Sequence, residues 1–71
     1  MNNLPIGVYV VLRLKERRFV YGYRLSDGWR WKGSDLVHQI EEIESYRLLT
    51  ESEYHTLYCD ESYEEYLDKF R

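Results

Sequence analysis

The stretch that decides the fold is IGVYVVLRLKERRFVYGYRLSDGWRWK, residues 6–32. Over residues 6–14, apolar side chains recur at every second position and many are β-branched, which is typical of a half-buried β-strand. The same alternation returns over residues 18–25, and a Ser-Asp-Gly turn separates it from Trp-Arg-Trp-Lys at residues 29–32. The pattern predicts a three-stranded antiparallel meander.

The first turn decides the register of the first two strands. If residues 16–17 form a two-residue turn, Leu14 faces Phe19 and Leu12 faces Tyr21, so that the apolar faces of both strands coincide. A longer, irregular turn is the alternative, because Glu-Arg is not a pair that two-residue hairpins favour.

The second turn decides how the third strand pairs. Residues 26–28 suit a three-residue loop with Gly28 in the left-handed conformation, which places Trp29 opposite Leu25. In this register one face of the meander is strongly aromatic. The opposite face carries Tyr9 and six cations: Arg13, Lys15, Arg18, Arg24, Arg30 and Lys32.

The segment after the meander has two interpretations. Residues 33–35 break the third strand and can cap a helix over residues 35–45, because apolar side chains follow at helical spacing. A bulged strand over residues 37–43 is the alternative. Residues 46–49 are short and end in two leucines, so they predict a fourth strand.

Two capping boxes mark helices near the C-terminus. Thr50 and Glu53 form the first, and Ser62 and Glu65 form the second. The helix after each box carries an apolar stripe that is rich in tyrosine. The residues of these stripes are Tyr54, Leu57 and Tyr58, then Tyr63, Tyr66, Leu67 and Phe70.

These elements predict an α+β fold. The aromatic face of the sheet needs a cover, and the amphipathic helices need a surface to cover. We therefore expect a small three- to four-stranded antiparallel β-meander with one face covered by two or three short helices. Residues 1–71 are expected to form a single domain, because a chain of this length buries only about 60% of its surface and holds one small core.

Composition narrows the class of protein. The chain is 44% hydrophobic and 17% aromatic, which argues against disorder. No apolar run approaches the roughly 18 residues that a membrane helix needs. The first three residues lack the basic start of a signal peptide, and the single Cys59 cannot form an intramolecular disulfide. We expect a cytoplasmic protein without a membrane contact.

Residues that could carry chemistry are few and scattered. His55 and Cys59 share a predicted helix face near Asp60 and Glu61, with His38 elsewhere, but zinc sites need three or four ligands in recognisable pairs. The sequence has no G-x-S-x-G motif, and its glycines are too scattered for a phosphate loop. We expect no metal, no cofactor and no enzymatic activity.

Charge is divided unevenly along the chain. Residues 1–40 hold seven Lys or Arg against three acids, whereas residues 41–71 hold three Lys or Arg against ten acids. A division of this size indicates interaction surfaces rather than a particular fold. A solvated surface that only keeps the protein in solution is the alternative.

The acidic half predicts a surface that imitates nucleic acid. Glu61, Glu64, Glu65 and Asp68 recur at helical spacing, at about one charge per 3.5 Å of helix axis. A DNA strand carries one phosphate per about 3.4 Å. With Glu51 and Glu53 as further members, these carboxylates are the candidate partner-binding residues, and the expected partner is a protein with a basic surface.

Three functions remain open. A tyrosine-rich, acidic chain of this size is similar in general type to phage-encoded inhibitors of host or CRISPR machinery, although no motif carries that similarity. The leading expectation is such an inhibitor, a DNA mimic that blocks a nucleic-acid-binding groove. The alternatives are a nucleic-acid-binding module that uses the basic face with Tyr9 for base stacking, and a structural subunit. The chain is expected to be a monomer or a small homo-oligomer.

Overall fold

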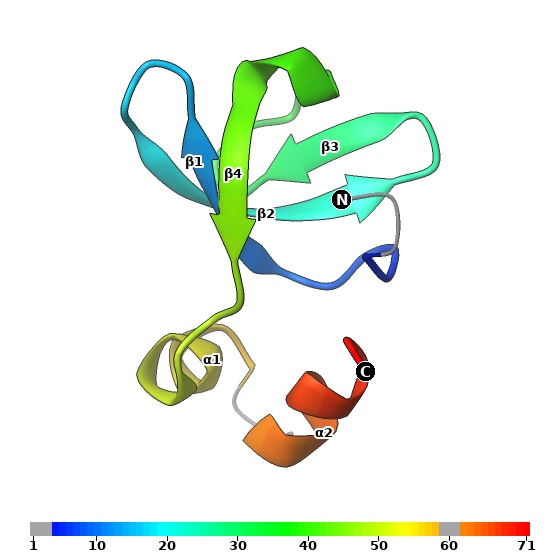
Figure 1. Ribbon diagram of the computed structural model, residues 1–71, viewed down its shortest axis with the longest axis vertical. Helices are drawn as coiled ribbons and strands as arrows, with labels where there is room; N and C mark the ends of the chain where they lie inside the picture. The colour runs from blue at the N-terminus through cyan, green and yellow to red at the C-terminus, as the bar shows by residue number, and fades with distance from the viewer. Residues whose placement is uncertain (1–3, 59–61) are drawn as a thin grey trace.

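The computed structural model describes residues 4–58 and 62–71, and in these residues it contains a four-stranded antiparallel sheet and two short helices (Figure 1). The order of the strands in the sheet is β3-β2-β1-β4. The predicted α+β class is therefore confirmed. The elements are β1 (Val10–Leu14), β2 (Phe19–Leu25), β3 (Gly28–Trp31), the 3₁₀ helix η1 (Ile40–Glu42), β4 (Ile43–Arg47), α1 (Glu51–Leu57) and α2 (Tyr63–Asp68).

The turn between β1 and β2 has three residues, so the two-residue turn was wrong and the longer turn, which was the alternative, is observed. The backbone N–H of Arg17 donates to the carbonyl of Leu14 at 3.0 Å, and the N–H of Leu14 donates to the carbonyl of Arg18 at 2.8 Å. Arg17 adopts the left-handed conformation with φ of 63°. This extra residue shifts the register by one, so that Arg13 rather than Leu14 lies opposite Phe19.

The turn between β2 and β3 is shorter than predicted. Leu25 pairs with Gly28, which leaves a two-residue loop at residues 26–27. Trp29 therefore lies opposite Arg24 rather than Leu25. Because side chains alternate between the two faces of a strand, each one-residue shift moves the side chains of β2 to the other face relative to β1 and β3.

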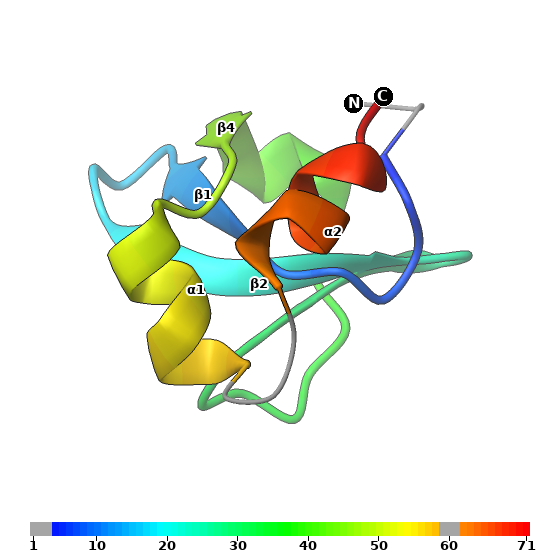
Figure 2. The ribbon, with the colours of Figure 1, turned by 90° about the horizontal axis from the view of Figure 1, so that it is seen from below.

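The sheet consequently has an apolar core on each face. The first, which we call the tryptophan core, holds buried residues of β1, β3 and β4 together with Leu4 from the N-terminal segment. The second, the tyrosine core, lies between the sheet and the two helices, which cover that face (Figure 2). The tryptophan core comprises Leu4, Val10, Leu12, Leu14, Trp29, Trp31 and Ile43, and the tyrosine core comprises Val11, Leu49, Tyr54 and Tyr66.

The predicted helix over residues 35–45 was wrong, and the bulged-strand alternative is closer to the structure. The backbone of His38 exchanges two hydrogen bonds with Trp29, at 2.7 and 2.8 Å, and this pairing holds the chain extended. A single turn of 3₁₀ helix follows, and β4 then begins at Ile43, three residues earlier than expected. A register irregularity between Arg13 and Leu14 marks the bulge where β4 pairs with β1. Burial of Ile43 in the tryptophan core outweighs local helix propensity.

The capping box at the start of α1 is confirmed. Thr50 Oγ1 accepts from the N–H of Glu53 at 3.2 Å, and Glu53 Oε1 accepts from the N–H of Thr50 at 2.9 Å. Ser62 stands at the N-cap of α2 as expected, but its side chain makes no capping hydrogen bond. α2 ends at Asp68 and is fixed instead by Tyr66, whose hydroxyl donates to the carbonyl of Tyr9 at 2.7 Å.

Candidate functional site

The two helices carry the carboxylates that the sequence singled out. α1 and α2 lie next to each other at one end of the longest axis of the molecule, and the 3₁₀ turn before β4 lies at the other end (Figure 1). Four of the predicted residues are exposed on these helices and form what we call the acidic helical surface: Glu51, Glu64, Glu65 and Asp68. Glu61 lies outside the described residues.

Glu53 has a different role from its neighbours. The guanidinium of Arg47 donates to both of its oxygens, at 2.8 and 3.1 Å, and the hydroxyl of Tyr21 donates to Oε2 at 3.3 Å. The hydrogen bond from Arg47, followed by that from the N–H of Thr50, lowers the pKa of Glu53 from 4.5 to about 2. Its carboxylate therefore links α1 to β2 and β4, and its oxygens already accept hydrogen bonds from residues of this chain.

Ion pairs divide the remaining carboxylates into two groups. In the sheet half, Glu16, Glu42 and Glu44 lie 3.2–3.6 Å from a basic side chain. Among the residues that the structure describes, none of the ion pairs involves Glu51, Glu64 or Glu65. Asp68 pairs with Arg71, at 2.8 Å. Glu51, Glu64, Glu65 and Asp68 therefore place four exposed carboxylates on two neighbouring short helices.

The predicted basic face does not exist as one surface. In the observed register Arg13 lies opposite Phe19 and Arg30 lies opposite Tyr23, so both share the face of the tyrosine core. Arg24 lies opposite Trp29 on the face of the tryptophan core. Arg18 lies opposite Leu14, on that same face, whereas Lys15 lies in the first turn and Lys32 follows β3. The predicted grouping was wrong because it depended on the predicted register, and the observed pairing of β2 with β1 and β3 differs from that register by one residue.

Most of these cations are also held by contacts within the chain. Arg13 pairs with Glu44 and Arg18 with Glu16. Arg24 donates to the carbonyl of Leu4 at 2.9 Å, and Arg30 donates to that of Asp35 at 3.3 Å. Lys15 and Lys32 are exposed.

Tyr9, expected at the surface for base stacking, is half-buried. Its ring packs edge-on against Tyr23 and Tyr58, at centroid distances of 5.1 and 6.0 Å. Burial, together with these neighbouring phenols, raises its pKa above the ordinary 10.0. Tyr46, by contrast, is exposed.

The sequence did not reveal a polar network between β3 and β4. Ser34 Oγ lies 3.1 Å from His38 Nε2, and His38 Nδ1 lies 3.4 Å from Glu42 Oε1, which is the connectivity of a nucleophile, a base and an orienting acid. The N–H of Ser34 also donates to the carbonyl of Trp31, and that of Leu36 donates to Ser34 Oγ. These contacts join the connection to β3, and we interpret the network as a structural support for it.

The described residues 4–58 and 62–71 contain no group of three or more His, Cys, Asp or Glu placed to hold a metal ion, and none of their helices is long and apolar enough to cross a membrane. Comparison of the chain with protein-family models, curated proteins and solved structures found no match. Fold and site together define a small α+β protein with an exposed acidic helical layer.

Proposed function

We propose that this protein is a non-enzymatic, protein-binding inhibitor that docks its acidic helical surface onto a basic nucleic-acid-binding groove of a target protein. The observation that carries the proposal is the contrast between two sets of carboxylates. Three carboxylates of the sheet half, Glu16, Glu42 and Glu44, lie beside basic side chains, whereas Glu51, Glu64 and Glu65 are exposed together on α1 and α2 and, among the described residues, belong to no ion pair.

The arrangement on α2 favours a charged partner. Glu64 and Glu65 precede Asp68 by four and three residues, and like charges at these spacings on a helix repel. A groove lined with Lys and Arg replaces this repulsion by attraction and releases the solvent around both surfaces. Occupancy of the groove suffices for inhibition, because a nucleic acid cannot enter it at the same time.

The distribution of cations gives less support to direct nucleic-acid binding. A phosphate backbone needs several free cations on one surface. Here Arg13 and Arg30 lie on one face of the sheet and Arg18 and Arg24 on the other, and each of the four has a partner within the chain. Nucleic-acid binding is therefore the second candidate function, and the experiment below is designed to distinguish it from protein binding.

The test is capture of partners by the immobilised full chain from a bacterial lysate, with and without nuclease. We expect a basic nucleic-acid-binding protein that is retained after nuclease treatment and displaced by added DNA. Retention should weaken as the salt concentration rises. Capture that disappears with nuclease would instead show that the protein holds nucleic acid itself.

A matched pair of double variants localises the contact. Replacing Glu64 and Glu65 by Lys is expected to abolish capture and to slow association first, because charge steers the encounter. Replacing the exposed residues Asp27 and Glu41 by Lys changes the net charge equally but leaves α1 and α2 unchanged. Equal loss of capture in both variants would assign the effect to net charge and would contradict a site on α2.

A further inference from the structure

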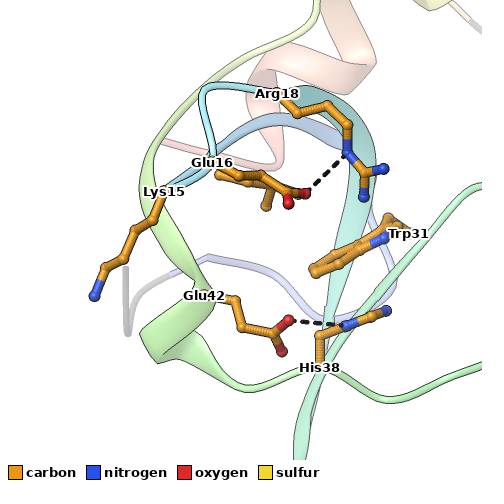
Figure 3. A pocket seen from close by; sticks show the side chains of 7 residues that line it. Lys15, Glu16, Arg18, Trp31, His38 and Glu42 are labelled. Carbon is orange, nitrogen blue, oxygen red and sulfur yellow. Dashed lines mark hydrogen bonds and ion pairs between the residues drawn. The ribbon is translucent and has the colours of Figure 1, made fainter.

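A second site lies in the sheet half, away from the helices. A pocket of about 250 Å³ opens between the turn that joins β1 to β2 and the 3₁₀ turn before β4 (Figure 3). Leu14 and Trp31 form its apolar wall, and Glu16 and Glu42 are its acidic members. Lys15, Arg18 and His38 complete its lining, and its position separates it from the acidic helical surface.

The two carboxylates converge on the pocket from different segments. In Figure 3 Glu16 reaches it from the first turn and Glu42 from the opposite side, while the side chain of Lys15 points away. Each carboxylate has one basic neighbour, Arg18 Nε at 3.2 Å from Glu16 and His38 Nδ1 at 3.4 Å from Glu42. The Glu16 pair is largely exposed, and exposed ion pairs contribute little, so a ligand can replace its partner.

The apolar wall is rigid and already formed. The imidazole of His38 stacks on the indole of Trp31 with ring centroids 3.4 Å apart and planes 12° apart. His38 is held in turn by Ser34 and Glu42. A ligand that packs on this wall does not have to order it first, which lowers the entropic cost of binding.

We propose that this pocket binds a single lysine or arginine side chain of a partner protein. The aliphatic part of such a side chain packs on Leu14 and Trp31, as long cationic side chains do along apolar surfaces. Its ammonium or guanidinium group then lies between the carboxylates of Glu16 and Glu42. The inference does not rest on the proposed function, because the pocket lies at the other end of the molecule from α1 and α2 (Figure 1).

The test is an NMR titration of the ¹⁵N-labelled full chain with N-acetyl-arginine methylamide and N-acetyl-lysine methylamide. We expect saturable shifts of the Trp31 indole and His38 signals. The control ligand is N-acetyl-citrulline methylamide, which has nearly the shape of the arginine probe without its charge. Equal shifts with this neutral ligand, or none at Trp31 with the cationic ones, would overturn the proposal.

Two single variants distinguish binding in the pocket from a general attraction of the cationic probe to the acidic protein. Glu16→Gln removes one of the converging charges at an exposed turn position and is expected to weaken binding of the arginine probe at least threefold. Glu41→Gln removes an exposed charge next to Glu42 that does not line the pocket, and binding should stay as in the unmodified protein. An unchanged affinity in Glu16→Gln, or an equal loss in both variants, would refute the site.

Discussion

Gly22 is a residue at which the observed register of the sheet leaves no room for a side chain. It lies in β2 opposite both Val10 and Trp31, on the face of the tryptophan core. A Cβ atom at this position would lie 2.5 Å from Leu12 Cδ1 and 3.3 Å from Trp31 Cβ. The side chains of the two neighbouring strands therefore meet over a glycine, and the predicted register would have put this residue on the outer face.

We predict that Gly22→Ala lowers the free energy of unfolding by about 1–3 kcal/mol, because an added methyl group overpacks a closed core. The measurement is urea denaturation followed by tryptophan fluorescence. Ser45→Ala, at an exposed position of β4, serves as the control and should leave the midpoint within experimental error. A Gly22→Ala variant as stable as the parent would show that the strands do not close over this position.

At the scale of elements, the sequence predicted most strands and both helices but not how they pair. Alternation places the strands, and the box of Thr50 and Glu53 places the start of α1. The register depends on turn geometry, and the first turn uses Arg17 in a left-handed conformation that ordinarily selects Gly or Asn. The Glu-Arg pair argues against a two-residue turn, but no residue of the turn marks Arg17 as the left-handed position.

The candidate site was predictable to a similar extent. The exposure of Glu51, Glu64 and Glu65 follows from helical periodicity. The internal role of Glu53 does not, because its partner Arg47 is brought within reach only by a β4 that begins at Ile43. Contacts between elements depend on the final packing rather than on local spacing.

Glu53 supports a prediction about pH, because it joins three elements. Its pKa is lowered from 4.5 to about 2 in the folded protein, chiefly by Arg47. The folded state therefore favours the ionised form, and this stabilisation is complete above about pH 4.5 and disappears as the pH falls towards 2. Glu53→Gln should cost about 1–2 kcal/mol at pH 7, since it removes the charge-assisted pair with Arg47 while Gln can still accept the capping hydrogen bond from Thr50.

The measurement is thermal unfolding of the parent and of Glu53→Gln between pH 7 and pH 2. The gap in melting temperature between them should narrow below about pH 4.5, because the Glu53 carboxylate of the unfolded parent takes up a proton there while that of the folded parent stays ionised until the pH approaches 2. Glu51→Gln is the control, because Glu51 is exposed on the same helix. A gap that is constant over the whole range would mean that the ion pair with Arg47 does not form in solution.

At the scale of the whole molecule, the sheet half and the helical layer differ both in how their charges are paired and in how they are packed. In the sheet half, Glu16 and Glu44 are paired with nearby arginines, while the helical layer leaves Glu64 and Glu65 exposed. The tyrosine core beneath these helices holds them by hydrogen bonds as well as by packing, since the Tyr63 hydroxyl donates to the carbonyl of Leu49 at 2.7 Å. The acidic helical surface is therefore presented on a fixed support rather than on a loose appendage.

The two cores are expected to unfold together. They are separated only by the sheet, and Leu48 and Phe70 pack against both. We predict one cooperative transition in urea, in which the fluorescence of the two tryptophans and the amide NMR signals of Tyr54 and Tyr66 give the same midpoint. Phe70→Ala should move both midpoints together, because it removes contacts from both cores. Tyrosine-core signals lost at lower urea than the fluorescence change would show that the helical layer is a separate unit docked on an independently stable sheet.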